Sequence, residues 1–298
     1  MITKTKFKRI DLEDATRIKE MLENAVVEAE ICDNSVGNIY MWKDTLDTEI
    51  TDDESFCIAE HYEGKTYFAL RRWDNNKGED YIDRINKLID EFGTPLYLCS
   101  MTDTEIHALK EAFGDRFSYD GEDGAADYIY DAETLRQYKG KKFHSQKNHM
   151  NAFLKQFANY TFRPYKKEEE TELLSFFDKY ENAVKDMTDS AKKESLACKR
   201  LIPMLPSLPV DSRVMRIDGN IAGFVVMERI GNTLMIHIEK GLPEFRGIYP
   251  MLVHLEANAY PDVEYINREE DDANEGLRRS KESYNPIMLK QKYLGIIE

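Results

Sequence analysis

A similar sequence pattern occurs twice in this chain, once near residue 7 and again near residue 162, about half the chain's length later. In each place a short segment (7–10 and 162–165) precedes a polar turn and a helical pattern with acidic residues near its start. One hydrophobic core usually stops growing at roughly 250–300 residues, and this chain has 298. We therefore expect two domains of about 150 residues each, built as two copies of one fold. Chance is the alternative, because strand–turn–helix beginnings are common.

Each half continues with the same order of elements, judged from the spacing of its apolar residues. In the first half we expect strands at 55–59, 66–72, 95–100 and 126–130, and helices at 80–92 and 104–113. In the second half we expect strands at 213–217, 221–229, 233–240, 263–267 and 292–297, and helices at 248–260 and 274–282. The prediction is an α/β fold (α+β, with mixed sheets). Its domains are 1–141 and 159–298, joined by a basic helix at 142–158.

Nine Lys or Arg residues and no acid occupy residues 134–167, in a chain whose formal net charge is −15. Such a concentration of positive charge is typical of a surface that meets phosphates, an acidic partner or the protein's own acidic face. We predict a basic groove that follows a nucleic-acid backbone while aromatic rings stack on bases. The residues of this groove are Lys139, Lys141, Lys142, His144, Lys147 and His149. A solvated helix face, or internal pairing with acids at 120–123 and 269–272, are the alternatives.

Several classes of protein are excluded by what the sequence lacks. The cysteines lie far apart and form no CxxC pair, which argues against a zinc site or a disulfide scaffold. No stretch approaches the roughly 20 apolar residues of a membrane span, and the N-terminus has no secretory pattern. A nucleophile elbow, a Walker loop, a dinucleotide fingerprint and an HExxH motif are all absent. We expect a cytoplasmic protein with no metal and no tightly bound cofactor.

Two polar groups in the second half are candidates for chemistry on an amine. In the strand at 233–240, alternation places His237 and Glu239 on one face, where they would act as a general-base pair. A core histidine beside a salt bridge is the alternative. Acids at 269–272 follow the next strand and would hold a cationic acceptor, unless they form a solvated loop. The acceptor-side candidates are Asn267, Glu269 and Asp272.

Short segments along most of the chain carry a family resemblance. They are 138–144 (Tyr-Lys-Gly-Lys-Lys-Phe-His), 147–149, 245–249 (Phe-Arg-Gly-Ile-Tyr), 267–271 (Asn-Arg-Glu-Glu-Asp), 276–278 and 281–284. These segments resemble the DUF2156 family, which is related to the catalytic C-terminal region of bacterial phosphatidylglycerol lysyltransferases. A meander, helix, strand, helix and strand is also the order of the N-acetyltransferase (GNAT) fold. Fem-type aminoacyl-tRNA transferases contain a tandem pair of such domains.

The resemblance implies a tandem GNAT-like acyltransferase with aminoacyl-tRNA or acyl-CoA as its co-substrate. The related lysyltransferases pass an aminoacyl group from tRNA to a lipid headgroup. This sequence shows no membrane-spanning segment, so a small-molecule or peptide acceptor is favoured over a lipid headgroup. The resemblance also implies that Tyr284 protonates the leaving group.

The loop before the helix at 248–260 is the predicted donor site. Exposed amides at a helix N-terminus bind phosphate, and Gly permits close backbone approach. The residues concerned are Gly241, Arg246, Gly247 and Tyr249. Acetyl-CoA enzymes of this fold usually carry Arg or Gln, two residues, Gly, one residue and Gly or Ala at this place. The sequence here departs from that pattern, which disfavours coenzyme A. An ordinary strand-to-helix loop is the alternative.

These observations predict a transferase that moves an aminoacyl group from tRNA to an amine or hydroxyl acceptor. An acetyl-CoA-dependent N-acetyltransferase is one alternative. A non-catalytic anion-binding protein that kept the fold is another, because fold alone does not fix function.

Overall fold

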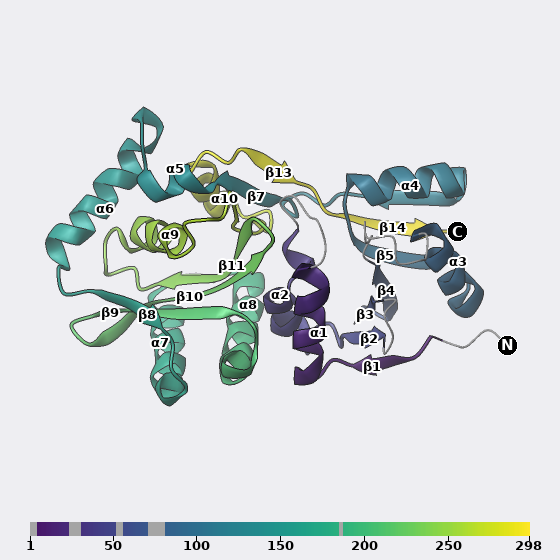
Figure 1. Cartoon of the computed structure of the whole chain (residues 1–298), viewed down its shortest axis with the longest axis horizontal. Coiled ribbons are helices and arrows are strands. Elements are labelled where there is room, and N and C mark those ends of the chain that lie inside the picture. The colour runs from purple at the N-terminus through teal and green to yellow at the C-terminus, as the bar shows by residue number, and fades with distance from the viewer. Residues whose placement is uncertain (1–4, 24–30, 52–55, 71–80, 185–186) are drawn as a thin grey trace.

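The computed structural model describes residues 5–23, 31–51, 56–70, 81–184 and 187–298. It contains two seven-stranded mixed sheets, each covered by helices on both faces (Figure 1). Residues 55, 71–72 and 80 of the predicted elements lie outside the described residues.

The first sheet has the order β1-β2-β3-β4-β5-β14-β6. Its strands are β1 (Phe7–Arg9), β2 (Glu49–Thr51), β3 (Cys57–Tyr62), β4 (Lys65–Leu70), β5 (Leu96–Met101), β14 (Tyr293–Ile297) and β6 (Phe117–Asp120). Its helices are α1 (Leu12–Glu23), α2 (Val36–Trp42), α3 (Tyr81–Phe92) and α4 (Asp103–Phe113). Among the described residues of this sheet, β4 and β5 form the one parallel pair.

The second sheet repeats this arrangement in the order β8-β9-β10-β11-β12-β7-β13. Its strands are β8 (Thr161–Pro164), β9 (Asp211–Ile217), β10 (Asn220–Ile230), β11 (Thr233–Gly241), β12 (Tyr265–Asn267), β7 (Asp127–Asp131) and β13 (Met288–Lys290). Its helices are α7 (Glu170–Ala183), α8 (Asp189–Leu201), α9 (Ile248–Ala259) and α10 (Glu275–Glu282). The β1–α1 and β8–α7 starts occupy equivalent places, so the sequence repeat reflects a structural repeat.

The two sheets exchange one strand each. β7 comes from the first half of the chain and lies between β12 and β13 of the second sheet. β14, the last strand, lies between β5 and β6 of the first sheet. Figure 1 shows the yellow C-terminal segment running from β13 to β14 across the molecule. The prediction that each half completes its own sheet is therefore wrong, and the sheets do not divide at 142–158.

One hydrophobic core joins the two halves. It contains Ile18 and Tyr40 from the first half and Phe177 and Ile238 from the second, all at most 1% exposed. Burial of this kind contributes roughly 25 cal/mol per Å² of apolar surface, so separating the halves would be unfavourable. The connecting segment forms α5 (Ala132–Gln137) and α6 (His144–Gln156), which pack against α9.

Tight turns and helix caps explain several boundaries. Asp218 and Gly219 have φ of 48° and 85°, the conformation of a tight hairpin between β9 and β10. Asn274 begins α10 by accepting hydrogen bonds from the backbone N–H of Gly276 and Leu277. Within the described residues, no helix has the length and apolar character needed to cross a membrane.

Candidate functional site

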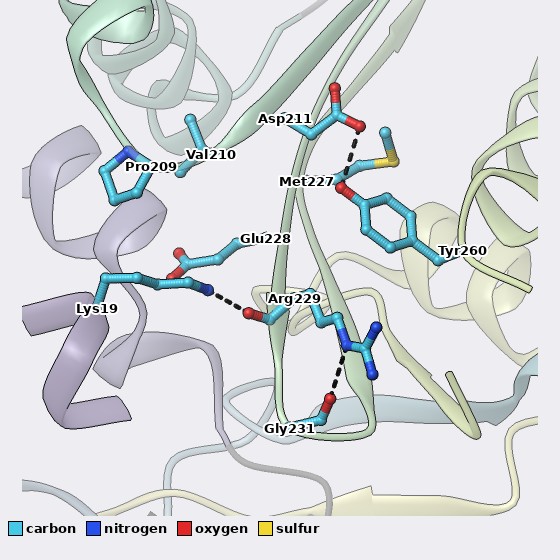
Figure 2. A pocket seen from close by; sticks show the side chains of 9 residues that line it. All are labelled: Lys19, Pro209, Val210, Asp211, Met227, Glu228, Arg229, Gly231 and Tyr260. Atoms are coloured by element: carbon cyan, nitrogen blue, oxygen red, sulfur yellow. Dashed lines mark hydrogen bonds and ion pairs between the residues drawn. The ribbon is translucent and has the colours of Figure 1, made fainter. Parts of the chain in front are cut away.

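A cavity of about 580 Å³ lies where α1 of the first half meets β9 and β10 (Figure 2). Lys19 of α1 forms one wall, and Glu228 and Arg229 of β10 form another. The carboxylate of Glu228 is fully buried: its Oε1 lies 3.5 Å from the ammonium of Lys19, and its Oε2 lies 3.4 Å from Nε2 of His237. The cavity and the polar network around His237 are therefore linked by one side chain.

β11 and β12 separate next to this network. They pair in parallel only from Thr233 with Tyr265 to Met235 with Asn267, after which β11 continues to Gly241. The ladder between β10 and β11 also shifts here, because Val226 pairs with Ile238 whereas Met227 pairs with Ile236. His237 is the additional residue, and it forms a β-bulge of the kind that interrupts a ladder near functional sites.

The bulge breaks the predicted alternation. Met235 and Ile238 belong to the core shared by both halves, whereas Ile236 belongs to the core under α9. His237 therefore faces α2 in the shared core, and Glu239 faces the opposite side of the strand. The prediction that His237 and Glu239 share one face is wrong, because the additional residue in the bulge shifts the alternation of side chains between the two faces of β11.

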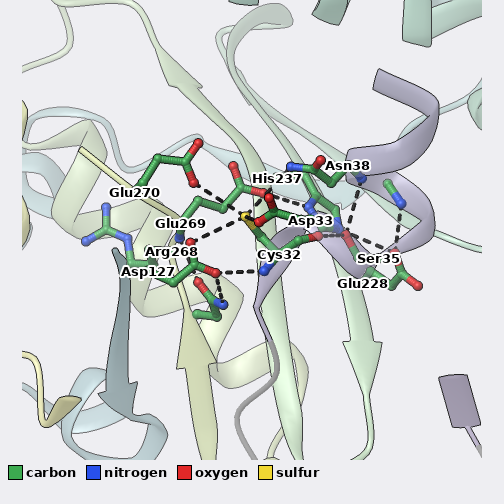
Figure 3. A network of polar contacts seen from close by, with 12 residues as sticks. Cys32, Asp33, Ser35, Asn38, Asp127, Glu228, His237, Arg268, Glu269 and Glu270 are labelled. Carbon is green, nitrogen blue, oxygen red and sulfur yellow. Dashed lines mark hydrogen bonds and ion pairs between the residues drawn. The ribbon is translucent and has the colours of Figure 1, made fainter. Parts of the chain in front are cut away.

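His237 is held between two carboxylates (Figure 3). Its Nδ1 lies 2.8 Å from Oε1 of Glu269, and its Nε2 lies 3.4 Å from Oε2 of Glu228. The backbone N–H of Gly37 in α2 donates to the same Glu228 oxygen at 2.8 Å. A Cβ atom on Gly37 would lie 2.2 Å from the His237 ring, so α2 closes directly over the imidazole.

The charges of this pair follow from burial and mutual attraction. Burial alone would lower the pKa of His237, but the neighbouring Glu228 and Glu269 raise it to about 9. Burial raises the pKa of Glu269 to about 7, against the opposing effect of His237. The imidazole is therefore protonated near neutral pH and joins segments from β10, β11 and the end of β12.

Glu239 makes a separate buried pair with Arg268. The two Arg268 nitrogens Nε and Nη2 lie 2.9–3.2 Å from the carboxylate oxygens. The guanidinium also lies 4.6 Å from the ring centroid of Tyr284 and 5.7 Å from that of Tyr130. Burial raises the pKa of Tyr284, so its hydroxyl stays protonated at neutral pH. Glu239 and Tyr284 thus meet through Arg268, a residue that the sequence did not single out.

A tight turn sends Arg268 and Glu269 to opposite faces of β11. Glu269 has φ of 58°, and its N–H donates to Oδ1 of Asn267 at 2.8 Å. The buried Lys281 ammonium donates to the carbonyl oxygens of Arg268 and of Glu269, the latter at 3.0 Å. Asp272 is exposed, and its backbone N–H donates to the carbonyl oxygen of Gly124. Among the described residues its side chain makes no contact with this network.

A second charged cluster joins the exchanged segments. The ammonium of Lys292, just before β14, lies 2.8 Å from Asp33, 2.8 Å from Glu270 and 3.2 Å from Asp127. Cys32, Asp33 and Asp127 have ligand atoms close enough to hold a metal ion. The ammonium of Lys292 already supplies the cation there, 3.5 Å from the Cys32 sulfur. No local pattern in the sequence marks this cluster, because its members come from both ends of the chain.

The predicted donor loop is shaped by packing. Gly247 has φ of 86°, and a Cβ there would lie 2.2 Å from the backbone oxygen of His149 in α6. A Cβ on Gly241 would lie 2.8 Å from Ile248, and the N–H of Gly241 donates to Tyr249 Oη at 3.4 Å. The backbone of α6 therefore occupies the space beside Gly247 that the prediction assigned to a phosphate. Arg246 is exposed, and anion binding by it stays a prediction.

The basic groove residues are all exposed, along α6 and the turn before it. They are Lys139, Lys141, Lys142, His144, Lys147 and His149. Four of the acids expected to neutralise them form ion pairs elsewhere. Glu269 binds His237 and Glu270 binds Lys292. Asp123 and Asp271 both bind Arg278. Within the described ranges no ion pair reaches these lysines, so the alternative of internal pairing is wrong.

Comparison with known proteins identifies the family. Residues 24–296 match the family described as "Phosphatidylglycerol lysyltransferase, C-terminal". The chain belongs to this family. The match spans nearly all of both sheets and includes the polar network around His237, and it confirms the resemblance seen in the sequence.

Three solved structures share the fold of this family member. A conserved protein of unknown function from Bacteroides thetaiotaomicron has a TM-score of 0.87 at 24% identity, covering 99% of this chain and 100% of its own. L-PGS from Bacillus licheniformis has a TM-score of 0.65 at 16% identity, covering 94% of this chain and 91% of its own. FemX has a TM-score of 0.62 at 9% identity, covering 98% of this chain and 97% of its own. The predicted class, α/β with mixed sheets in tandem GNAT-like units, is confirmed.

Proposed function

We propose that this chain transfers an aminoacyl group from tRNA to an amine or hydroxyl acceptor. Its family is described as the C-terminal region of phosphatidylglycerol lysyltransferase, which supports a transferase in general terms. The observation that carries the specific proposal is the row of exposed cations on the α5–α6 segment, in a chain of net charge −15. Unneutralised cations in an acidic protein favour a polyanionic partner, and tRNA is the polyanion that also carries aminoacyl groups.

The separation of β11 from β12 is the proposed place for the reacting ester. Beyond Met235, β11 is no longer paired with β12, and we propose that its backbone groups on that edge receive the ester carbonyl. Tyr284 is the proposed proton donor to the leaving ribose oxygen, since its hydroxyl is protonated at neutral pH. Arg268 and Glu239 would hold the ring of Tyr284 in place.

This geometry argues against His237 as a base that contacts the acceptor. Its side chain is fully buried beneath Gly37. We propose instead that its charge fixes Glu269 and α2 around the site. The same burial favours the second candidate, a non-catalytic protein that binds anions. Acetyl-CoA as donor is disfavoured because the carbonyl of His149 occupies the close approach at Gly247.

The test is binding of bulk aminoacyl-tRNA to the whole chain at low and moderate salt. Reversing the charge of Lys141 and Lys142 together (to Glu) should weaken binding more than tenfold and reduce its salt dependence. Reversing Lys192 and Lys193 on α8, which are equally exposed, is the matched control and should have little effect. Equal losses in both variants would show that net charge alone matters and would count against the proposed surface.

A further inference from the structure

The cavity between α1 and β10 presents hydrogen-bond acceptors to a single cation. The ammonium of Lys19 donates to the backbone carbonyl of Arg229 and lies 3.5 Å from Oε1 of Glu228 (Figure 2). The Glu228 carboxylate is 0% exposed, and only 14% of the Lys19 side chain is exposed. A buried carboxylate needs compensating charge and hydrogen bonds. His237 and the N–H of Gly37 face Oε2 of Glu228, and the ammonium of Lys19, from the first half of the chain, faces Oε1.

The other charged groups at the cavity are already neutralised. The guanidinium of Arg229 binds the carbonyl of Gly231 at 2.9 Å and the carboxylate of Asp262, turning its charge away. Asp211 is paired with Arg213 at 2.8 Å, and it accepts from the Tyr260 hydroxyl at 3.0 Å. Glu228 and the Arg229 carbonyl oxygen are thus two acceptors that hold the Lys19 ammonium, and both suit any primary ammonium.

The remaining wall suits the hydrocarbon part of such a ligand. Pro209, Val210 and Met227 line the cavity beside Lys19. A volume of about 580 Å³ lies within the range of small-molecule sites. An apolar wall next to acceptors that hold an ammonium matches an alkylammonium ion in both shape and charge.

We propose that this cavity binds the primary ammonium group of a small alkylammonium ligand, which takes the place of the Lys19 ammonium against Glu228 and the Arg229 carbonyl. Lys19 is then an internal competitor. It reaches the position from α1 by a flexible four-carbon stem, so it can withdraw without rearrangement of the sheet. This inference concerns binding only, and it goes beyond the proposed transfer reaction, so either can fail without the other.

The probe is n-butylammonium chloride, added to the full chain and followed by thermal unfolding. Lys19→Ala should have a lower Tm than the wild type, and butylammonium should restore it in a saturable manner. The wild type should bind butylammonium with an apparent affinity at least tenfold weaker than that of Lys19→Ala, because its own Lys19 occupies the position. Adding Glu228→Gln to Lys19→Ala should abolish the response. If Lys19→Ala does not fold, Lys19→Met keeps most of the stem and is tested in its place.

Two controls separate specific binding from a general solvent effect. 1-Butanol is a neutral probe of similar size and should not restore the Tm. Lys199→Ala on α8 removes a lysine that is paired with Asp178 and Glu181, away from the cavity, and should gain no response. Equal responses in wild type, Lys19→Ala and Lys199→Ala would overturn the proposal. So would a folded Lys19→Ala or Lys19→Met variant that does not respond.

Discussion

Replacing Gly37 by Ala tests the closure of α2 over His237. The added Cβ would lie 2.2 Å from Cδ2 and 2.5 Å from Nε2 of the ring, closer than any ordinary contact. The ring cannot turn away freely, because Glu269 holds its Nδ1 at 2.8 Å. Overpacking of this kind costs roughly 1–3 kcal/mol, and weakening the charged hydrogen bond from Gly37 to Glu228 costs about 1.5–3 kcal/mol. Higher helix propensity returns about 1 kcal/mol. We expect a net destabilisation of about 1.5–5 kcal/mol.

Urea unfolding followed by fluorescence is a suitable assay, since Trp42 is the last residue of α2. A double-mutant cycle with His237→Ala isolates the contact, because removing the ring removes the clash. The double variant should be at least about 1 kcal/mol more stable than the sum of the two single changes predicts. A neutral or stabilising Gly37→Ala, or strict additivity in the cycle, would refute the packing described here.

Three further outcomes follow from the same contacts. The pKa of His237 is raised from 6.5 to about 9 in the folded state, so its contribution to stability is fully present below pH 6.5 and is lost as pH rises through 9. The free energy of unfolding, measured in urea, should therefore fall by about 3 kcal/mol over this range. His237→Gln should remove most of this pH dependence. Arg268→Met should destabilise by roughly 3–5 kcal/mol because it leaves Glu239 buried and unpaired, and adding Glu239→Gln should recover part of the loss in calorimetry. Each half of the chain, cut within 142–158, should fail to fold alone and should regain circular dichroism on mixing, because each sheet takes one strand from the other half.

The local elements were predictable because their signals are local. The hairpin at Gly219, the end of α3 at Gly93 and the repeated starts of β1 and β8 depend on a few adjacent residues. The exchange of β7 and β14 was not predictable in this way. Both strands have ordinary apolar patterns, and neither pattern specifies which sheet supplies its neighbours.

The candidate site was predictable in composition but not in geometry. Glu269 and His237 meet as a pair, yet the bulge that moves His237 to another face has no signature in strand 233–240. Arg268 was hidden within an acidic segment, although it contacts both Glu239 and Tyr284. The ion pairs of Lys292 depend on the exchanged strands, so they follow from topology that no local pattern contains.

The most direct test of the proposed function is transfer of label from bulk aminoacyl-tRNA. The chain would be incubated with tRNA carrying radiolabelled amino acids and with the small-molecule fraction of a cell extract, and the products separated by chromatography. We predict a labelled product whose formation requires the protein, is inhibited by salt and is lost in Tyr284→Phe. If label leaves tRNA no faster than in the protein-free control, aminoacyl transfer is contradicted. That result would favour an anion-binding protein without catalysis.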